Sequence, residues 1–151
     1  MSRDANAVRQ GRPGTIESIM TTTVVTMSPE ASVAEVIQIL GGNGFRHLLV
    51  VDGAGRLAGV ISDRDVLRCI GRGANPAAAR VASIMNRDPI VVRPDTSVKD
   101  AIDLLSFHRI NCLPVVAGGG TLCGIVTTTD VLAALYDLLG RLEPPKPLPA
   151  V

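Results

Sequence analysis

One seven-residue motif occurs twice in the chain, as GVISDRD at residues 59–65 and as GIVTTTD at residues 124–130. Each copy consists of a glycine, two aliphatic residues, a hydroxyl residue, two variable positions and an aspartate. The aliphatic residues end a run that predicts a strand, and Ser or Thr is a residue type that begins helices. We therefore expect a strand-to-helix junction at both places.

The duplication extends beyond these two junctions. An offset of 65 residues pairs Met20 with Met85 and aligns residues 18–67 with residues 83–132 without a gap. In this alignment 18 of the 50 pairs are identical, far more than unrelated segments share. The chain is therefore an internal duplication, and each copy is expected to be one structural unit.

The bulk composition limits the class of protein. The 151 residues are 46% hydrophobic but only 2% aromatic, which indicates one domain with an aliphatic core. The net charge of +1 gives no field that would attract nucleic acid or an anionic membrane. No apolar run reaches the roughly 20 residues that span a bilayer, and residues 1–13 lack the apolar segment of a signal peptide. We expect a cytoplasmic protein.

The three cysteines do not indicate a metal site. Cys69, Cys112 and Cys123 are odd in number and have no CxxC spacing, which argues against a disulfide framework and against a zinc site. We expect buried or partly buried reduced thiols and no bound metal.

Each copy shows the same order of elements. The order is an extended segment, a helix, two strands joined by a glycine-containing turn, and a second helix. In the first copy the extended segment is predicted at 24–27, the strands at 48–51 and 57–61, and the helices from Ser32 and from Ser62. In the second copy the extended segment is predicted at 89–92, the strands at 113–116 and 122–126, and the helices from Ser97 and from Thr127. Gly41, Gly42 and Gly44 are expected to end the first helix. One unit of this size buries too little apolar surface alone, so we expect an α/β fold of two pseudo-symmetric β-α-β-β-α units packed sheet to sheet.

The expected boundaries follow from this order. They are a flexible arm at 1–14, the first unit at 15–72, a linker at 73–79, the second unit at 80–139, and a Pro-rich tail at 140–151.

The junction motif permits two interpretations. Ser/Thr-x-x-Asp at a helix start is a capping arrangement, in which hydroxyl and carboxylate satisfy backbone N–H groups. The same position can also bind a ligand, because a helix N-terminus attracts anions and a nearby carboxylate can accept hydrogen bonds from a ribose diol.

The whole pattern resembles the CBS domain, named after cystathionine β-synthase. The resemblance covers about four fifths of the chain and rests on motifs that recur in both copies: SIM at 18–20 and 83–85, VAEV at 33–36 and VKDA at 98–101, RHLLVVD at 46–52 and NCLPVV at 111–116, and the two junctions. A free-standing tandem pair resembles a Bateman module, which in this family binds adenosine-containing ligands in clefts between the motifs.

The resemblance implies roles for matching positions. Asp65 and Asp130 would hold ribose hydroxyls, and Ser62 and Thr127 would contact ribose or phosphate. The adenine would lie between the extended segments at 24–25 and 89–90. The groups just before the middle strands, at 46–47 and 111–112, would lie near the adenine or the phosphates. The expected ligand-binding set is completed by Val24, Val25, Pro89, Ile90, Arg46, His47, Arg64, Asn111 and Cys112.

The two copies differ at these positions. Arg46-His47 aligns with Asn111-Cys112, and Asp63-Arg64 aligns with Thr128-Thr129. The first copy carries cationic groups suited to phosphate, whereas the second is neutral and rich in hydroxyls. We expect unequal sites, with a phosphorylated ligand in the one lined by Arg46, His47 or Arg64, although Arg46 and His47 can equally be solvated surface groups.

The sequence favours a binding module over an enzyme. His47 and His108 are the only histidines, no spacing supports a catalytic cluster, and no P-loop lysine follows the glycines. We expect a regulatory, energy-sensing module with no required cofactor, which binds AMP, ADP, ATP, NAD or S-adenosylmethionine and signals to a partner protein.

Two alternatives to ligand sensing stay open. One is an interaction or scaffold module without a small-molecule ligand. The other is weak nucleic-acid binding, against which the few aromatic residues and the near-neutral charge argue. The resemblance further implies a homodimer, and no membrane association is expected.

Overall fold

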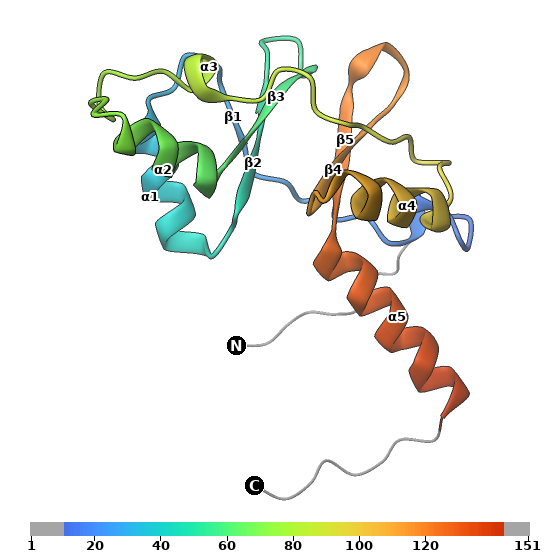
Figure 1. Ribbon diagram of the computed structural model, residues 1–151. Coiled ribbons are helices and arrows are strands. Elements are labelled where there is room, and N and C mark those ends of the chain that lie inside the picture. Colours follow the sequence, from blue (N-terminus) through green and yellow to red (C-terminus); the bar gives the residue numbers. More distant parts are fainter. Residues whose placement is uncertain (1–10, 144–151) are drawn as a thin grey trace, which may run out of the picture.

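The elements of the first repeat lie beside those of the second in a computed structural model that describes residues 11–143 (Figure 1). The helices and strands are η1 (Ile16–Ser18), β1 (Thr26–Met27), α1 (Val33–Asn43), β2 (His47–Val51), β3 (Leu57–Ser62), α2 (Asp63–Gly71), α3 (Val81–Ile84), α4 (Val98–His108), β4 (Cys112–Val116), η2 (Gly118–Gly120), β5 (Leu122–Thr127) and α5 (Thr128–Leu142). Residues 1–10 of the expected arm and 144–151 of the expected tail lie outside the described residues.

Two small sheets form the centre. β1 is parallel to β2, which is antiparallel to β3, and β4 is antiparallel to β5. Leu49, Val60 and Cys112 form a buried cluster between the two sheets, packed by Leu57 and Ile125 among others. The predicted α/β architecture of two similar units packed sheet to sheet is therefore confirmed. The extended segment of the second repeat contributes only a single parallel bridge, between Val92 and Val115.

Capping residues begin the four long helices as predicted. Ser32, Ser62 and Thr127 each form a full capping box, and the Ser97 side chain accepts a hydrogen bond from the Asp100 N–H. Of the three glycines expected to end the first helix, Gly44 is confirmed as its C-cap, and the expectation for the other two was wrong. Gly41 and Gly42 lie inside α1, which ends at Asn43, because only Gly44 adopts the left-handed conformation that stops a helix (φ 68°).

The leading segment of each repeat packs on the other repeat. Ile16 and Ile19, around η1, belong to the core of the second unit, and Val81 of α3 belongs to the core of the first. The exchange explains the junction glycines, because a Cβ at Gly59 would lie 2.7 Å from the Asn86 carbonyl oxygen. The equivalent Cβ at Gly124 would lie 2.8 Å from the Thr21 carbonyl oxygen. These glycines therefore admit the neighbouring chain at the strand.

The last helix departs from the repeat. α2 has 9 residues and α5 has 15, so α5 continues to Leu142, into the segment expected as tail. In Figure 1 it extends away from the sheets. None of the helices between residues 11 and 143 is long and apolar enough to cross a membrane.

Candidate functional site

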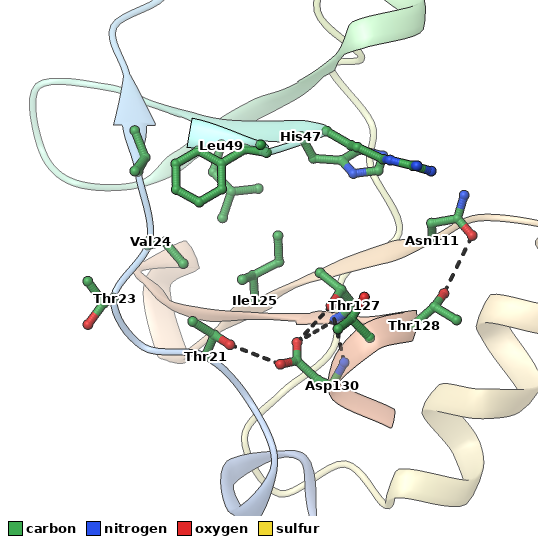
Figure 2. A pocket seen from close by; sticks show the side chains of 15 residues that line it. Thr21, Thr23, Val24, His47, Leu49, Asn111, Ile125, Thr127, Thr128 and Asp130 are labelled. Atoms are coloured by element: carbon green, nitrogen blue, oxygen red, sulfur yellow. Dashed lines mark hydrogen bonds between the residues drawn. The ribbon is translucent and has the colours of Figure 1, made fainter. Parts of the chain in front are cut away.

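A pocket of about 680 Å³ opens between the two repeats. One wall comes from the beginning of β2, the opposite wall from β5 and the beginning of α5, and a third side from the segment before β1 (Figure 2). Each wall therefore belongs to a different stretch of sequence, and the pocket exists only because the two sheets face each other. It is lined by Thr21, Thr23, Val24, Val25, Gly44, Phe45, Arg46, His47, Leu49, Asn111, Ile125, Thr127, Thr128, Thr129 and Asp130.

The carboxylate of Asp130 is fixed at the floor of this pocket. Its Oδ2 accepts hydrogen bonds from the Thr127 backbone N–H at 2.8 Å and from Thr127 Oγ1 at 3.0 Å, which is the capping box. Its Oδ1 accepts a hydrogen bond from Thr21 Oγ1 at 3.0 Å, as Figure 2 shows. Each carboxylate oxygen can accept more than one hydrogen bond. Asp130 thus caps α5 and still offers acceptor capacity to a ligand.

The opposite wall carries two basic residues. Arg46 and His47 stand where the chain enters β2, and Arg46 is exposed whereas His47 is half-buried. Burial lowers the pKa of His47 below its usual value, and Arg46 lowers it further, while Asp63 and Asp65 act to raise it. Near pH 7 the imidazole is therefore mainly neutral, and a nearby anion would favour its protonation.

The N-terminus of α5 completes the polar side. The Thr128 N–H donates to the Asn111 carbonyl at 3.0 Å, and Thr128 Oγ1 donates to Asn111 Oδ1 at 3.4 Å. Thr129 follows in the same first turn and also lines the pocket. Hydroxyl groups and the positive end of a helix dipole are suited to an anionic group.

The predicted site residues divide into those that line the pocket and those that do not. Val24, Val25, Arg46, His47, Asn111, Thr127 and Asp130 line the pocket. The residues outside its lining are Ser62, Arg64, Asp65, Pro89, Ile90 and Cys112. The pocket thus combines the cationic residues of the first repeat with the junction of the second, whereas Arg64 stays with the other junction.

Asp65 repeats the capping geometry of Asp130 at the first junction. Asp65 Oδ2 accepts from the Ser62 N–H and from Ser62 Oγ, both at 2.8 Å. Its Oδ1 lies 3.8 Å from Arg68 of the same helix. The capping interpretation of the motif is therefore confirmed in both repeats, and only Asp130 also lines the described pocket.

Sequence reasoning missed several lining residues. Thr21 and Thr23 belong to a run of three threonines that interrupts two apolar stretches, and that run was the available signal. Phe45 precedes Arg46 and is one of only two phenylalanines in the chain. The alignment of Thr128 and Thr129 with Asp63 and Arg64 does not by itself predict that they line the pocket.

The remaining reactive groups lie apart from this chemistry. Cys69, Cys112 and Cys123 are free thiols, and burial between the sheets raises the pKa of Cys112 to about 11. Within residues 11–143 no group of three or more His, Cys, Asp or Glu side chains is arranged to hold a metal ion.

Comparison with known proteins identifies the family. The model of the CBS domain matches residues 16–72 and 81–137, and the chain therefore belongs to the CBS domain family as a tandem pair. The meiotically up-regulated gene 70 protein of Schizosaccharomyces pombe is 34% identical over 74% of this chain. Inosine-5'-monophosphate dehydrogenase of Korarchaeum cryptofilum is 36% identical over 84% of it. The chain spans only 16% and 27% of the lengths of these two relatives.

Solved structures of CBS proteins superpose closely. CBSX2 in complex with AMP has a TM-score of 0.74 and 30% identity, covering 83% of this chain and 98% of that one. The cytosolic domain of the Mg²⁺ channel MgtE in complex with ATP gives 0.71 and 34%, covering 82% and 50%. The CBS domain pair of protein MJ0100, in complex with 5-methylthioadenosine and S-adenosyl-L-methionine, gives 0.74 and 25%, covering 82% and 97%.

Proposed function

We propose that this chain is a regulatory module that binds a phosphorylated adenosine ligand in the pocket between its repeats and passes the binding event to a partner protein. The observation that carries the proposal is that one cavity places the carboxylate of Asp130, which can accept hydrogen bonds from a ribose, opposite the cationic Arg46 and the neutral imidazole of His47. The similarity to structures that hold AMP, ATP or S-adenosyl-L-methionine supports an adenosine ligand.

The pocket offers a suitable place for each part of such a ligand. Val24 and Ile125, which are only partly buried, provide apolar surface for the faces of an adenine ring. Asp130 can accept hydrogen bonds from the ribose diol, as acidic residues do in other nucleotide sites. Arg46 and the first turn of α5 lie at the polar side, where phosphate oxygens would be bound by charge-assisted hydrogen bonds.

The charge of the pocket favours a phosphate over a sulfonium group. S-Adenosylmethionine carries a sulfonium and an ammonium group against a single carboxylate, so its net charge is positive and is less suited to an arginine and a helix N-terminus than a phosphate is. AMP, ADP, ATP and NAD present anionic oxygens to the same groups. Within the adenosine class, we therefore propose a phosphorylated ligand.

A ligand panel tests this function. Thermal denaturation is followed with AMP, ADP, ATP, NAD, S-adenosylmethionine, cyclic dinucleotides and unphosphorylated adenosine. A ligand that binds only the folded state raises stability by RT ln(1 + [L]/Kd), so the midpoint should rise with concentration for the phosphorylated adenosine compounds and less for adenosine. A flat response to every compound would contradict ligand sensing and favour a scaffold module. Mass spectrometry of the denatured protein would identify a co-purified ligand.

We also propose that the chain forms a homodimer, through which ligand binding reaches the partner. Exposed apolar side chains recur at equivalent positions of the two repeats, which supports this. Leu67 and Leu132 are 68% and 59% exposed, and Ile70 and Leu135 are 45% and 47% exposed. Large apolar patches on the surface of a monomer are rare and typically mark an interface. A ligand can act through such an interface only if it binds two arrangements of the dimer with different affinity.

A further inference from the structure

Side chains of both repeats hold the carboxylate of Asp130. Its Oδ2 accepts hydrogen bonds from Thr127 of the same repeat, and its Oδ1 accepts the hydrogen bond that Thr21 Oγ1 donates at 3.0 Å (Figure 2). Thr21 lies 109 residues before Asp130 in the chain, in the segment that leads into the first repeat. The contact therefore joins the leading segment of the first repeat to the candidate ribose acceptor of the second.

The backbone fixes the place of the Thr21 hydroxyl. The Thr21 N–H donates to the Ile125 carbonyl and the Ile125 N–H donates to the Thr21 carbonyl, both at 2.9 Å. The missing side chain of Gly124 makes room for this crossing. Ile16, earlier in the same segment, is fully buried in the core of the second unit. The Thr21 side chain itself is exposed, so the backbone and the core hold its hydroxyl beside Asp130.

The aspartate of the first junction is oriented in another way. Asn86 aligns with Thr21, but its side-chain oxygen accepts a hydrogen bond from a backbone N–H of its own segment, at 3.1 Å. Asp65 Oδ1 lies 3.8 Å from Arg68 of the same helix. Asp130 is thus oriented by a contact between the repeats, whereas Asp65 is oriented within one helix.

We propose that Thr21 is a positioning residue for the ligand, and that through it binding at Asp130 strengthens the docking of residues 15–21 on the second repeat. This inference rests on the proposed function and adds to it a residue and a response. The Thr21 hydroxyl orients Oδ1 and leaves it able to accept a second hydrogen bond, from the ribose. A carboxylate that is already oriented loses less conformational freedom when the ligand binds.

The response of the segment follows from linkage. If docking of the segment raises the affinity for the ligand by some factor, the ligand must favour docking by the same factor. The ligand therefore acts on a segment of the first repeat through a residue of the second. The two parts of the proposal are tested separately.

A pair of nucleotides tests the positioning role. AMP and its dideoxy form, which lacks both ribose hydroxyls, differ only in the groups that Asp130 would bind. Thr21→Val removes the hydroxyl and keeps the branched shape, so it should raise the Kd for AMP about fivefold and the Kd for dideoxy-AMP less than about twofold. Thr21→Ser restores a hydroxyl and should return the Kd for AMP to within about twofold of the wild type. Isothermal titration measures AMP, and displacement of AMP measures the weaker dideoxy form.

The neighbouring threonine provides the matched control. Thr22 is also exposed but does not line the pocket, so Thr22→Val should leave both affinities unchanged. Equal losses for the two nucleotides in Thr21→Val would reduce Thr21 to a packing role and overturn the positioning. A wild type that prefers AMP to dideoxy-AMP, with the same preference in Thr21→Val, would overturn this inference and leave the proposed function standing. A wild type that binds no phosphorylated adenosine compound would overturn both.

Hydrogen exchange tests the response of the segment. The amides of Ile16 and Thr21 donate to carbonyl groups of the second repeat, at 2.8 and 2.9 Å. Opening of the segment breaks the contact between Thr21 and Asp130, so saturating AMP should slow the exchange of these amides about fivefold more in the wild type than in Thr21→Val.

The leading segment of the second repeat serves as the internal control. The amide of Val81 in α3 donates to the Ala31 carbonyl of the first repeat at 2.8 Å. AMP at saturation should slow its exchange equally in the wild type and in Thr21→Val. Equal slowing at positions 16 and 21 in the two proteins would overturn the coupling between ligand and segment.

Discussion

The two strand-to-helix junctions share one geometry and differ in surroundings. At both, an aspartate accepts a hydrogen bond from the backbone N–H of the capping residue at 2.8 Å. The second oxygen of Asp130 accepts from Thr21, a residue of the exchanged leading segment, whereas that of Asp65 lies 3.8 Å from Arg68 of its own helix. The same motif therefore performs the same structural task twice, but only at Asp130 does it also border the described pocket.

This difference shows that a capping aspartate can also line a pocket. A capping aspartate is held in one orientation by its own helix, which prepares its remaining lone pairs for a ligand at little entropic cost. Whether those lone pairs are used depends on what the other repeat places opposite. At Asp130 the opposite wall provides Arg46 and His47. At the first junction, the position aligned with Thr128 is the anionic Asp63, which would repel a phosphate.

Substitution of the two aspartates should give the strongest contrast between the junctions. Asp130→Asn should raise the Kd for AMP about 100-fold, because two hydrogen bonds from the ribose to a charged acceptor are weakened. Asp65→Asn should change that Kd by less than about threefold, and both substitutions should lower the free energy of unfolding by a similar amount of about 1 kcal/mol through the weakened cap. Isothermal titration calorimetry and thermal denaturation measure the two quantities. Equal losses of affinity in the two variants would place the ribose elsewhere.

Much of the fold could be predicted from the sequence, because the signals that begin its helices act over a few neighbouring residues. The capping residues Ser32, Ser62 and Thr127 act within one helical turn, so the helix starts could be predicted correctly. The exchange of η1 and α3 was not predicted, because these short helices have too few residues to show a period. Gly44 ends α1 as predicted, but Gly41 and Gly42 were wrongly expected to end it, because they are held in the helix despite their low helix propensity.

The candidate site could be predicted only in part, because its residues are distant from one another in the sequence. The residues of the pocket come from stretches around 21–25, 44–49 and 111–130, and no local pattern joins them. The family resemblance indicated which residue types to expect. It did not indicate that Arg46 and His47 would face Asp130 while Arg64 stayed outside the lining, because that grouping depends on how the two sheets pack.

A smaller effect separates the two candidate arginines. Arg46→Ala should weaken AMP binding about tenfold, as expected for loss of a charge-assisted hydrogen bond at an exposed position. Binding of adenosine should change less than about twofold, since it has no phosphate to lose. Arg64→Ala removes the same charge from α2 outside the pocket lining and serves as the matched control. The assignment of the phosphate to Arg46 fails if adenosine and AMP lose affinity equally, or if Arg64→Ala has the larger effect on AMP.

The weakest effect is expected at His47, which lines the pocket beside the second junction and interacts electrostatically with aspartates of the first. Its side chain lines the pocket, while Asp63 and Asp65, which act to raise its pKa, belong to the first junction. Burial lowers the pKa of the His47 imidazole in the free protein. A bound phosphate should raise this pKa, because its negative charge favours the protonated imidazole. Phosphate binding should therefore become stronger as the pH falls through the pKa that His47 has in the complex. The increase should be complete below the pKa that His47 has in the free protein.

Titrations of AMP from pH 7.5 to 5.5 measure this dependence. The affinity of the wild type relative to His47→Asn should rise about threefold over this range. The ratio cancels the titration of the phosphate itself, whose second pKa is about 6. Asp63→Asn removes an anion that raises the His47 pKa, so the rise should move to lower pH although Asp63 is absent from the pocket lining. A wild-type profile parallel to that of His47→Asn would show that the imidazole does not meet the phosphate. A response in the wild type that Asp63→Asn left unmoved would show that the first junction exerts no electrostatic influence on the pocket.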